Sequence, residues 1–218
     1  MHILILGYSN IVKKRVLPAL ANIALVSQID VASRSAAAQV ELPPTMNGLT
    51  FADYDEALAN SKAEVVYIST LNPLHAGLAA KALARGFHVI VDKPAVTDFP
   101  DAQKLVDLAR EHRRCLAEST VFSYHPQIAL ARQAFITAKS TPTRITAVFS
   151  FPPRAADDYR YKKSLGGGAL FDVGPYAIAP GRLFFQAEPS EIRCQINDRG
   201  GEDGADIAFS LLAVYPGG

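Results

Sequence analysis

The chain has 218 residues, 49% of them hydrophobic, which is enough for one large domain or two modest ones with a folded core. Its 22 Lys and Arg nearly balance 21 Asp and Glu, which argues against nucleic-acid or anionic-membrane partners. No apolar run is long enough for a membrane span, and the start is too short for a signal peptide. Cys115 and Cys194 lie far apart and the histidines follow no metal-binding pattern, so we expect a cytoplasmic protein with reduced thiols and no metal.

Apolar runs alternate with helical stretches through the first half of the chain, which predicts a doubly wound parallel sheet of the α/β class. Strands are predicted over 2–6, 25–33, 64–69, 87–91 and 115–119, with a short one near 49–51. Helices are predicted over 11–22, 54–60, 73–85 and 99–113. Gly86 should end the third helix with a positive φ, and Thr97 or Asp98 should cap the fourth.

After about residue 120 the pattern predicts a second, α+β domain with an open, mainly antiparallel sheet. Helices are expected over 125–139 and 172–185, a β-rich stretch over 144–151, and strands over 191–197 and 206–215. We expect domains of 1–121 and 122–218. The chain stops at 216–218 in what reads as a turn after a strand, so a further hairpin strand should follow and the sheet should be incomplete here.

The segment from Glu64 to Ala95 reads as strand, helix, strand. Such a unit places the carboxyl ends of its parallel strands on one edge, where α/β sheets bind ligands. Lys93 follows the second strand and is restricted by Pro94, so we expect it to point into a cleft. The plainer alternative is a solvated lysine at a strand end.

The first strand ends at Gly7 in G-Y-S-N-I-V, where Ser9 and Val12 replace the second and third small residues of a dinucleotide fingerprint. Gly7 can still make the tight turn. The helix start, at Ser9, Asn10 and Ile11, still offers N–H groups to a diphosphate. An ordinary βα turn is the alternative.

The second strand ends in V-A-S-R-S, with Ser33 where NAD-selective sites carry an acidic residue. Arg34 could stack on adenine and pair with a 2′-phosphate, with Ser33 and Ser35 adding hydrogen bonds. This predicts NADP(H) in preference to NAD(H). A surface arginine without such a role is the alternative.

Several motifs occur in an order that resembles the glucose–fructose oxidoreductase, inositol dehydrogenase and rhizopine catabolism (Gfo/Idh/MocA) family. They are G-Y-S-N-I, V-A-S-R-S, Y-I-S-T-L-N-P-L-H, D-K-P, A-E-S-T-V-F-S-Y-H-P-Q and G-G-G-A-L-F-D-V-G-P-Y. The resemblance implies an N-terminal Rossmann domain, a C-terminal domain with an open sheet often used for oligomerisation, and hydride transfer between nicotinamide C4 and a sugar carbon. Asp92 replaces the family's usual glutamate, and members are longer, with several more strands after this point.

The resemblance makes Lys93 the catalytic lysine, Asp172 the aspartate of D-x-G-x-[YH], and Tyr176 the last residue of that segment. Asp172 and Tyr176 are expected to share one face of a helix. Tyr176 would be the general acid in reduction, with Lys93 holding its hydroxyl and stabilising the oxyanion. Asp172 would bind a sugar hydroxyl and orient Lys93. Lys93 as the acid is the rival assignment, and core packing of Tyr176 or capping by Asp172 are the structural alternatives.

Further cofactor candidates follow the third and fifth parallel strands. Thr70, Asn72 and His75 are expected at the nicotinamide ribose edge, although Asn72 and His75 could simply start the helix. Glu118 could face the carboxamide or form a salt bridge.

Further substrate candidates belong to the second domain. Tyr124 and His125 could meet substrate, or His125 could only shape a turn before Pro126. Arg160 and Lys163 could grip a phosphate or nucleotide-sugar, or be solvated loop charges.

The leading interpretation is an NADP(H)-dependent oxidoreductase that acts on a sugar or sugar derivative and forms a homo-oligomer through its C-terminal sheet. A catalytically silent NADP- or sugar-binding regulator on the same fold is the alternative. A nonfunctional fragment of a longer enzyme is the third possibility.

Overall fold

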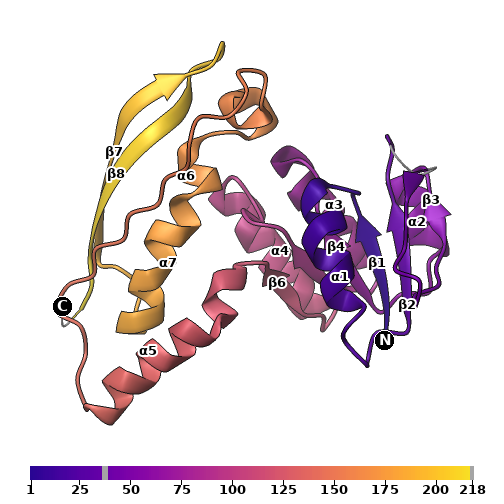
Figure 1. Ribbon diagram of the computed structural model, residues 1–218, viewed down its shortest axis with the longest axis horizontal. Coiled ribbons are helices and arrows are strands. Elements are labelled where there is room, and N and C mark those ends of the chain that lie inside the picture. The colour runs from indigo at the N-terminus through magenta and orange to yellow at the C-terminus, as the bar shows by residue number, and fades with distance from the viewer. Residues whose placement is uncertain (36–38, 217–218) are drawn as a thin grey trace. The chain divides into compact units, whose positions relative to one another are not determined.

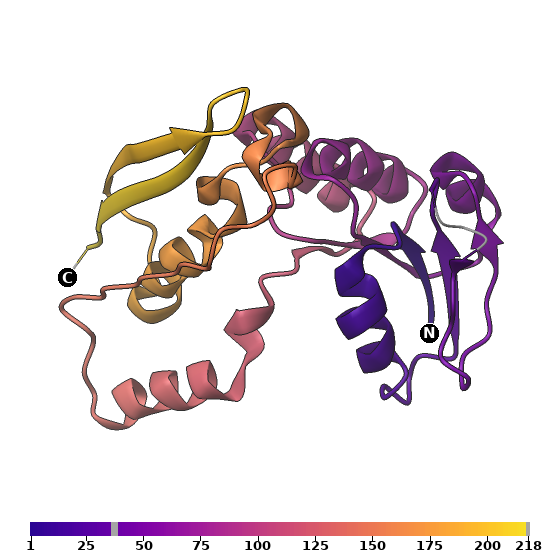
Figure 2. The same ribbon diagram turned by 45° about the horizontal axis from the view of Figure 1, so that its top comes forward.

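The computed structural model describes residues 1–35 and 39–216 and divides into two compact units, Met1–Ser119 and Thr120–Gly218 (Figures 1 and 2). Gly217 and Gly218, in the predicted terminal turn, lie outside the described residues. Within the described part of the chain, no helix is long and apolar enough to cross a membrane. Cys115 and Cys194 are free, exposed thiols.

The first unit is built on a six-stranded sheet with the order β3-β2-β1-β4-β5-β6 (Figure 1). Its strands are β1 (His2–Leu6), β2 (Gln28–Ala32), β3 (Thr50–Phe51), β4 (Val65–Ile68), β5 (His88–Val91) and β6 (Leu116–Glu118). Every neighbouring pair is parallel, which confirms the predicted doubly wound sheet. The strand order reverses at β1, the position at which sheets of this kind bind ligands.

The helices of this unit follow the predicted pattern. They are a π-helical turn η1 (Val12–Val16), α1 (Leu17–Leu20), α2 (Tyr54–Asn60), α3 (Asn72–Ala84) and α4 (Phe99–Glu111). Gly86 has a φ of +85° just after α3. Asp98 caps α4 by accepting a hydrogen bond from the Asp101 N–H at 2.8 Å. The two predicted helix boundaries are therefore confirmed.

The core lies on both faces of the sheet because alternate strand residues point to opposite sides. Leu4 and Leu6 belong to a buried cluster that includes side chains of α2, α3 and α4. Ile3 and Ile5 belong to a second cluster, which is completed by Val12 and the start of α1. Helix side chains therefore pack on both faces of the sheet.

The second unit combines short helices with one antiparallel hairpin. Its elements are η3 (Val121–Tyr124), α5 (Pro126–Thr137), η4 (Tyr159–Tyr161), η5 (Lys163–Leu165), α6 (Ala169–Asp172), α7 (Gly174–Phe185), β7 (Glu191–Gly200) and β8 (Ala205–Val214). Tyr215 stacks on Phe185 with ring centroids 4.8 Å apart. A Cβ at Gly181 would collide with the Tyr215 phenol, so this glycine lets the end of the hairpin lie against α7. The predicted antiparallel pair is confirmed.

One predicted element of the second unit is wrong. Residues 144–151 form no strand, which would need a hydrogen-bonded neighbour; they line a hollow of about 1360 Å³ together with residues of β8 and α7. The helix predicted over 172–185 is confirmed as α7 (Gly174–Phe185), which begins two residues later than predicted. Val173, with a φ of −115° and a ψ of −13°, separates it from α6 just before Gly174-Pro175.

Candidate active site

The predicted cofactor residues of the first unit gather at the carboxyl edge of its sheet. Five residues are level across the ladder: Ala32, Leu6, Ile68, Val91 and Glu118. The residues that end or follow these strands therefore meet along one edge. The predicted residues placed there are Gly7, Ser9, Asn10, Ile11, Ser33, Arg34, Ser35, Thr70, Asn72, Lys93 and Glu118.

The turn after β1 fits a dinucleotide despite its incomplete glycine pattern. Gly7 has a φ of +103°, and a Cβ there would collide with the Ser69 carbonyl, so only glycine allows this close approach. The Ser9 hydroxyl accepts a hydrogen bond from the Val12 N–H at 3.2 Å and lies 2.8 Å from Ser69 Oγ. Val12 is fully buried in the core. Both replacements are thus accommodated inside the domain. The Ser9 hydroxyl takes up the Val12 N–H, and an anion would be met by the backbone of the turn and helix start before it.

The end of β2 presents Arg34 beside an aromatic ring. Ser33 is buried and its N–H donates to the Phe51 carbonyl at 3.0 Å. Arg34 and Ser35 are exposed, and the Arg34 guanidinium lies 5.0 Å from the centroid of the Tyr54 ring. A cation held over an aromatic face in this way is restricted in direction, which suits the binding of a phosphate group.

The start of α3 places the three candidates after β4 differently. Thr70 is half-buried and Asn72 is the first residue of the helix. His75 is turned into the interior and is 1% exposed. Its Nδ1 lies 2.9 Å from the Pro94 carbonyl oxygen and its Nε2 lies 3.1 Å from the Thr70 carbonyl oxygen. Both ring nitrogens of His75 therefore face backbone groups of the protein itself.

The loop after β5 carries Lys93, which is half-buried and joined to Pro94 by a cis peptide bond. The Asp92 carboxylate accepts hydrogen bonds from Ser69 Oγ at 2.5 Å and from the Tyr67 hydroxyl. Burial, and then the charge and hydrogen bond of Asp92, raise the pKa of Tyr67 above its ordinary value. The Tyr67 hydroxyl therefore acts as a proton-bearing donor to Asp92.

Sequence reasoning missed the Tyr67–Ser69–Asp92 cluster. Tyr67 stands in an apolar strand and reads as core, and Asp92 reads as a minor change in the D-K-P motif. The available signal was positional: Ser69 and Asp92 follow strands that are neighbours in the sheet. Glu118 closes the same region, since its Oε2 accepts a hydrogen bond from the Ala95 N–H at 2.9 Å.

In the second unit the structure brings Arg160 and Asp172 together. Arg160 Nε donates to Asp172 Oδ2 at 2.7 Å, and its Nη1 lies 3.2 Å from Asp158 Oδ1. Partial burial pulls the pKa of Arg160 down, but electrostatic interactions with Tyr159 and with the carboxylates of Asp172 and Asp158 outweigh this and raise it. Arg160 is thus held by two carboxylates and fixes the direction of Asp172.

Tyr176 lies in an aromatic cluster. Its ring stacks on Phe149 with centroids 4.5 Å apart and meets Phe122 at 5.4 Å. The prediction that Asp172 and Tyr176 share one helix face is wrong, because α6 ends at Asp172 and Tyr176 belongs to α7. The Gly-Pro pair after Val173 was the signal for this break.

The remaining candidates of the second unit have local surroundings of their own. The Tyr124 side chain is 83% exposed. His125 caps α5, since its Nδ1 accepts a hydrogen bond from the Gln127 N–H at 3.2 Å. Lys163 is exposed, and its backbone N–H donates to Asp203 Oδ1 at 2.8 Å. A missed acidic residue, Asp206, accepts from the Leu170 N–H at 2.7 Å and lies where a Cβ on Gly168 would collide with it.

A glycine turn at the strand-order reversal of a parallel sheet, with a basic residue after β2, defines a dinucleotide-binding α/β protein. The chain belongs to the GFO/IDH/MocA oxidoreductase family, which confirms the resemblance of its motifs. The model of the GFO/IDH/MocA oxidoreductase family, NAD-binding Rossmann fold, matches residues 1–120. The model of the GFO/IDH/MocA C-terminal domain matches residues 140–218.

Two of the relatives that the chain matches are named as sugar oxidoreductases. The dTDP-3,4-didehydro-2,6-dideoxy-alpha-D-glucose 3-reductase of Streptomyces violaceoruber is 33% identical over 97% of this chain and 62% of its own. The D-xylose 1-dehydrogenase (NADP(+)) 2 of Haloferax volcanii is 31% identical over 98% of this chain and 66% of its own. This chain therefore spans less than two thirds of the length of either relative.

Solved structures show the same architecture. A 3-ketoreductase from Actinomadura kijaniata in complex with NADP and TDP-benzene is 31% identical, with a TM-score of 0.77 over 89% of this chain and 59% of that one. An aldose-aldose oxidoreductase from Caulobacter crescentus, at 19% identity, shares the fold with a TM-score of 0.81 over 99% of this chain and 68% of that one.

Proposed function

We propose that the chain is an NADP(H)-dependent oxidoreductase that transfers hydride between nicotinamide C4 and a carbonyl or hydroxyl carbon of a sugar or sugar derivative. The observation that carries the proposal is the position of Lys93 at the carboxyl edge of a dinucleotide-binding sheet. The loop around it is held by contacts of Asp92, His75 and Glu118. The names of the relatives, a dTDP-sugar reductase and an NADP-dependent xylose dehydrogenase, support the substrate class and the cofactor.

A bound nicotinamide would supply the hydride for reduction. The protein would stabilise the negative charge that develops on the substrate oxygen and supply the proton to it. Negative charge develops on the carbonyl oxygen, and the Lys93 ammonium stabilises it. Tyr176 donates the proton, and its stacking on Phe149 restricts the direction of the hydroxyl. Asp172, fixed by Arg160, binds a sugar hydroxyl. The alternative is that Lys93 itself is the acid. The turnover of Lys93→Ala and of Tyr176→Phe, measured separately, distinguishes the two assignments.

The proposal includes a cytoplasmic setting and self-association through the β7–β8 sheet. Leu212 and Val214, which are two residues apart in β8 and therefore lie on one face of this hairpin, are 63% and 41% exposed, an arrangement that favours burial against another surface. Sedimentation of the purified chain across a concentration series tests it, and a monomer at every concentration would contradict this part of the proposal.

Titration of the purified chain with NADPH and with NADH tests the cofactor assignment. We expect NADPH to bind at least about tenfold more tightly, because a 2′-phosphate gains charge-assisted hydrogen bonds from Arg34. Arg34→Ala should remove most of this preference and leave NADH affinity within about threefold. The readout is nicotinamide fluorescence. Arg110→Ala is the matched control, since Arg110 is an exposed arginine of the same unit that pairs weakly with Asp107 at 3.8 Å.

Each outcome of the titration has a definite meaning. Equal affinity for NADH and NADPH would reject the role of Arg34. Binding of neither cofactor would reject the proposed function. Tight NADPH binding without oxidation or reduction of any member of a ketosugar and nucleotide-sugar panel would favour the catalytically silent regulator.

A further inference from the structure

The loop that carries Lys93 is anchored on its N-terminal side by Asp92. The Asp92 N–H donates to the Ile68 carbonyl at 2.9 Å, and its carboxylate accepts from Ser69 and Tyr67 of the neighbouring strand end. The Ser69 hydroxyl in turn lies 2.8 Å from that of Ser9, in the turn after β1. The residue before Lys93 is thereby fixed to the same edge that forms the dinucleotide turn.

The same loop is anchored on its C-terminal side by His75 from α3. The ring is 1% exposed, and its two nitrogens lie 2.9 Å from the Pro94 carbonyl oxygen and 3.1 Å from the Thr70 carbonyl oxygen. Carbonyl oxygens only accept hydrogen bonds and a neutral imidazole carries one N–H, so the ring donates to one of these two oxygens, of which that of Pro94 is the nearer. It links the segment after β4 to the segment after β5.

Glu118 supplies a second anchor on this side, from the end of β6. Its Oε2 accepts the Ala95 N–H at 2.9 Å. The position of Glu118 is itself fixed, because it is level with Val91 in the ladder and the next residue, Ser119, donates its N–H to the Val91 carbonyl at 2.7 Å. Two side chains from two elements therefore hold the backbone directly after Lys93.

We propose that His75 and Glu118 are positioning residues for Lys93, which act by holding the Pro94–Ala95 backbone. A lysine side chain is long and flexible, so the place of its ammonium depends on how firmly its Cα is held. Asp92 is anchored on one side of Lys93 and Pro94–Ala95 on the other. The Cα of Lys93 is therefore fixed, and its side chain extends from a defined position at the edge of the sheet. This inference rests on the proposed function of Lys93. His75 and Glu118 would affect catalysis only through the loop that carries Lys93.

Paired variants separate this role from simple core packing. His75→Asn keeps an amide nitrogen near the place of Nδ1, toward Pro94, whereas His75→Gln keeps one near Nε2, toward Thr70. Glu118→Gln keeps an oxygen acceptor for the Ala95 N–H, and Glu118→Ala removes it. The control is His88→Gln, because His88 Nδ1 accepts the Cys115 N–H at 3.0 Å at the opposite end of β5.

We expect His75→Gln and Glu118→Ala to lower kcat at least about tenfold, since small displacements of a reacting group are costly. The Kd for NADPH should change by less than about threefold. His75→Asn and Glu118→Gln should recover most of the lost kcat, and His88→Gln should keep it. Equal losses in kcat for His75→Asn and His75→Gln, or a weakening of NADPH binding that matches the loss in kcat, would overturn the proposal.

A second readout needs neither cofactor nor turnover. Hydrogen exchange of the Ala95 amide should accelerate at least about tenfold in Glu118→Ala and remain slow in Glu118→Gln. The NMR signal of the Lys93 ammonium and its Cε, assigned by its loss in Lys93→Arg, should shift or broaden in His75→Gln and not in His88→Gln. Unchanged exchange and an unchanged lysine signal would reject the positioning role. If the chain binds no NADPH, the proposed function fails and these measurements alone decide whether the loop is held as proposed.

Discussion

Replacing Lys93 with Ala is expected to lower turnover of a sugar substrate by about 10²-fold or more, because the developing oxyanion would lose the cation proposed to stabilise it. Tyr176→Phe should have an effect of similar size, because it removes the proposed proton donor. The phenylalanine keeps the ring that stacks on Phe149, so the loss reports the hydroxyl and not the packing. Steady-state kinetics with NADPH and a ketosugar from the substrate panel give kcat for each variant.

The double variant and a surface control sharpen this test. If Lys93 and Tyr176 serve one chemical step, the double variant should lose little more than the worse single variant. Lys104→Ala, an exposed lysine of α4, should keep its turnover. A severe loss for Lys93→Ala beside a mild one for Tyr176→Phe would support Lys93 as the acid. Near-normal turnover in both single variants would reject the assignment.

The parallel sheet could be predicted because its signals are local. Apolar runs separated by helical stretches give the strands, and Gly86 and Asp98 mark helix boundaries by their own chemistry. The carboxyl edge follows from the parallel direction of the strands, so Gly7 and Lys93 could be placed on it without a structure.

What the sequence did not predict depends on which segments become neighbours. Residues 144–151 have strand-like composition but no paired partner, and period-2 patterns do not specify pairing. The hydrogen bonds of Tyr67 and Ser69 to Asp92 follow from the β4–β5 register, in which Ile68 is level with Val91. The inward direction of His75 likewise depends on the loop that packs beside α3.

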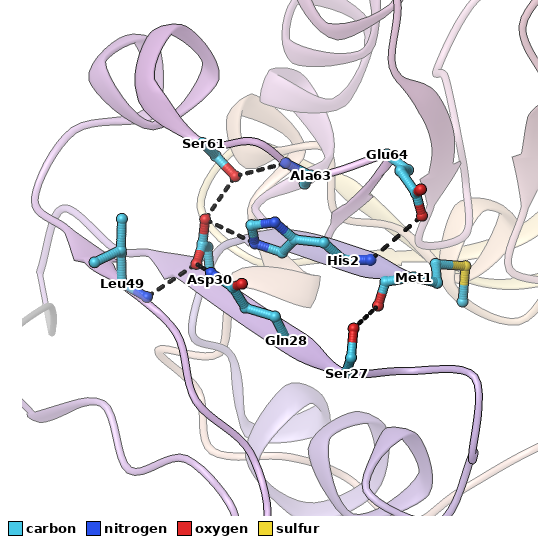
Figure 3. A network of polar contacts seen from close by, with 9 residues as sticks. All are labelled: Met1, His2, Ser27, Gln28, Asp30, Leu49, Ser61, Ala63 and Glu64. Carbon is cyan, nitrogen blue, oxygen red and sulfur yellow. Dashed lines mark hydrogen bonds and ion pairs between the residues drawn. The ribbon is translucent and has the colours of Figure 1, made fainter.

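A different polar cluster, around Asp30 of β2, supports the stability of the first unit (Figure 3). Asp30 is fully buried and accepts hydrogen bonds from Ser61 Oγ at 2.6 Å and from the Leu49 N–H at 2.9 Å. His2 Nε2 lies 2.9 Å from Asp30 Oδ2 in an ion-pair contact without hydrogen-bond geometry. Burial raises the pKa of Asp30, but the hydrogen bonds from Ser61 and Leu49 and the nearby His2 outweigh it and lower the pKa below 3.8.

Asp30→Ala is therefore expected to lower the free energy of unfolding by about 3 kcal/mol at pH 7, because buried donors lose their acceptor. Asp30→Asn, which keeps one acceptor oxygen but no charge, should cost about 1–2 kcal/mol. Urea unfolding followed by circular dichroism measures both. Asp107→Ala is the control, since Asp107 belongs to an exposed i,i+3 pair and should change the value by less than about 0.5 kcal/mol.

The pH dependence of the free energy of unfolding separates the contribution of the Asp30 charge from that of the shape of its side chain. A carboxyl whose pKa is lower in the folded state than in the unfolded state stabilises the fold above its unfolded value, and this contribution is lost as the pH falls through the folded value. The difference between the wild-type chain and Asp30→Asn should thus be greatest near neutral pH and should narrow below the ordinary Asp value of 3.8. Unfolding measured at a series of pH values from neutral to acid gives this difference directly. A difference that stayed constant across the series would mean that the ionised form of Asp30 contributes nothing, and that the hydrogen bonds to Ser61 and Leu49 stabilise the protonated side chain equally well.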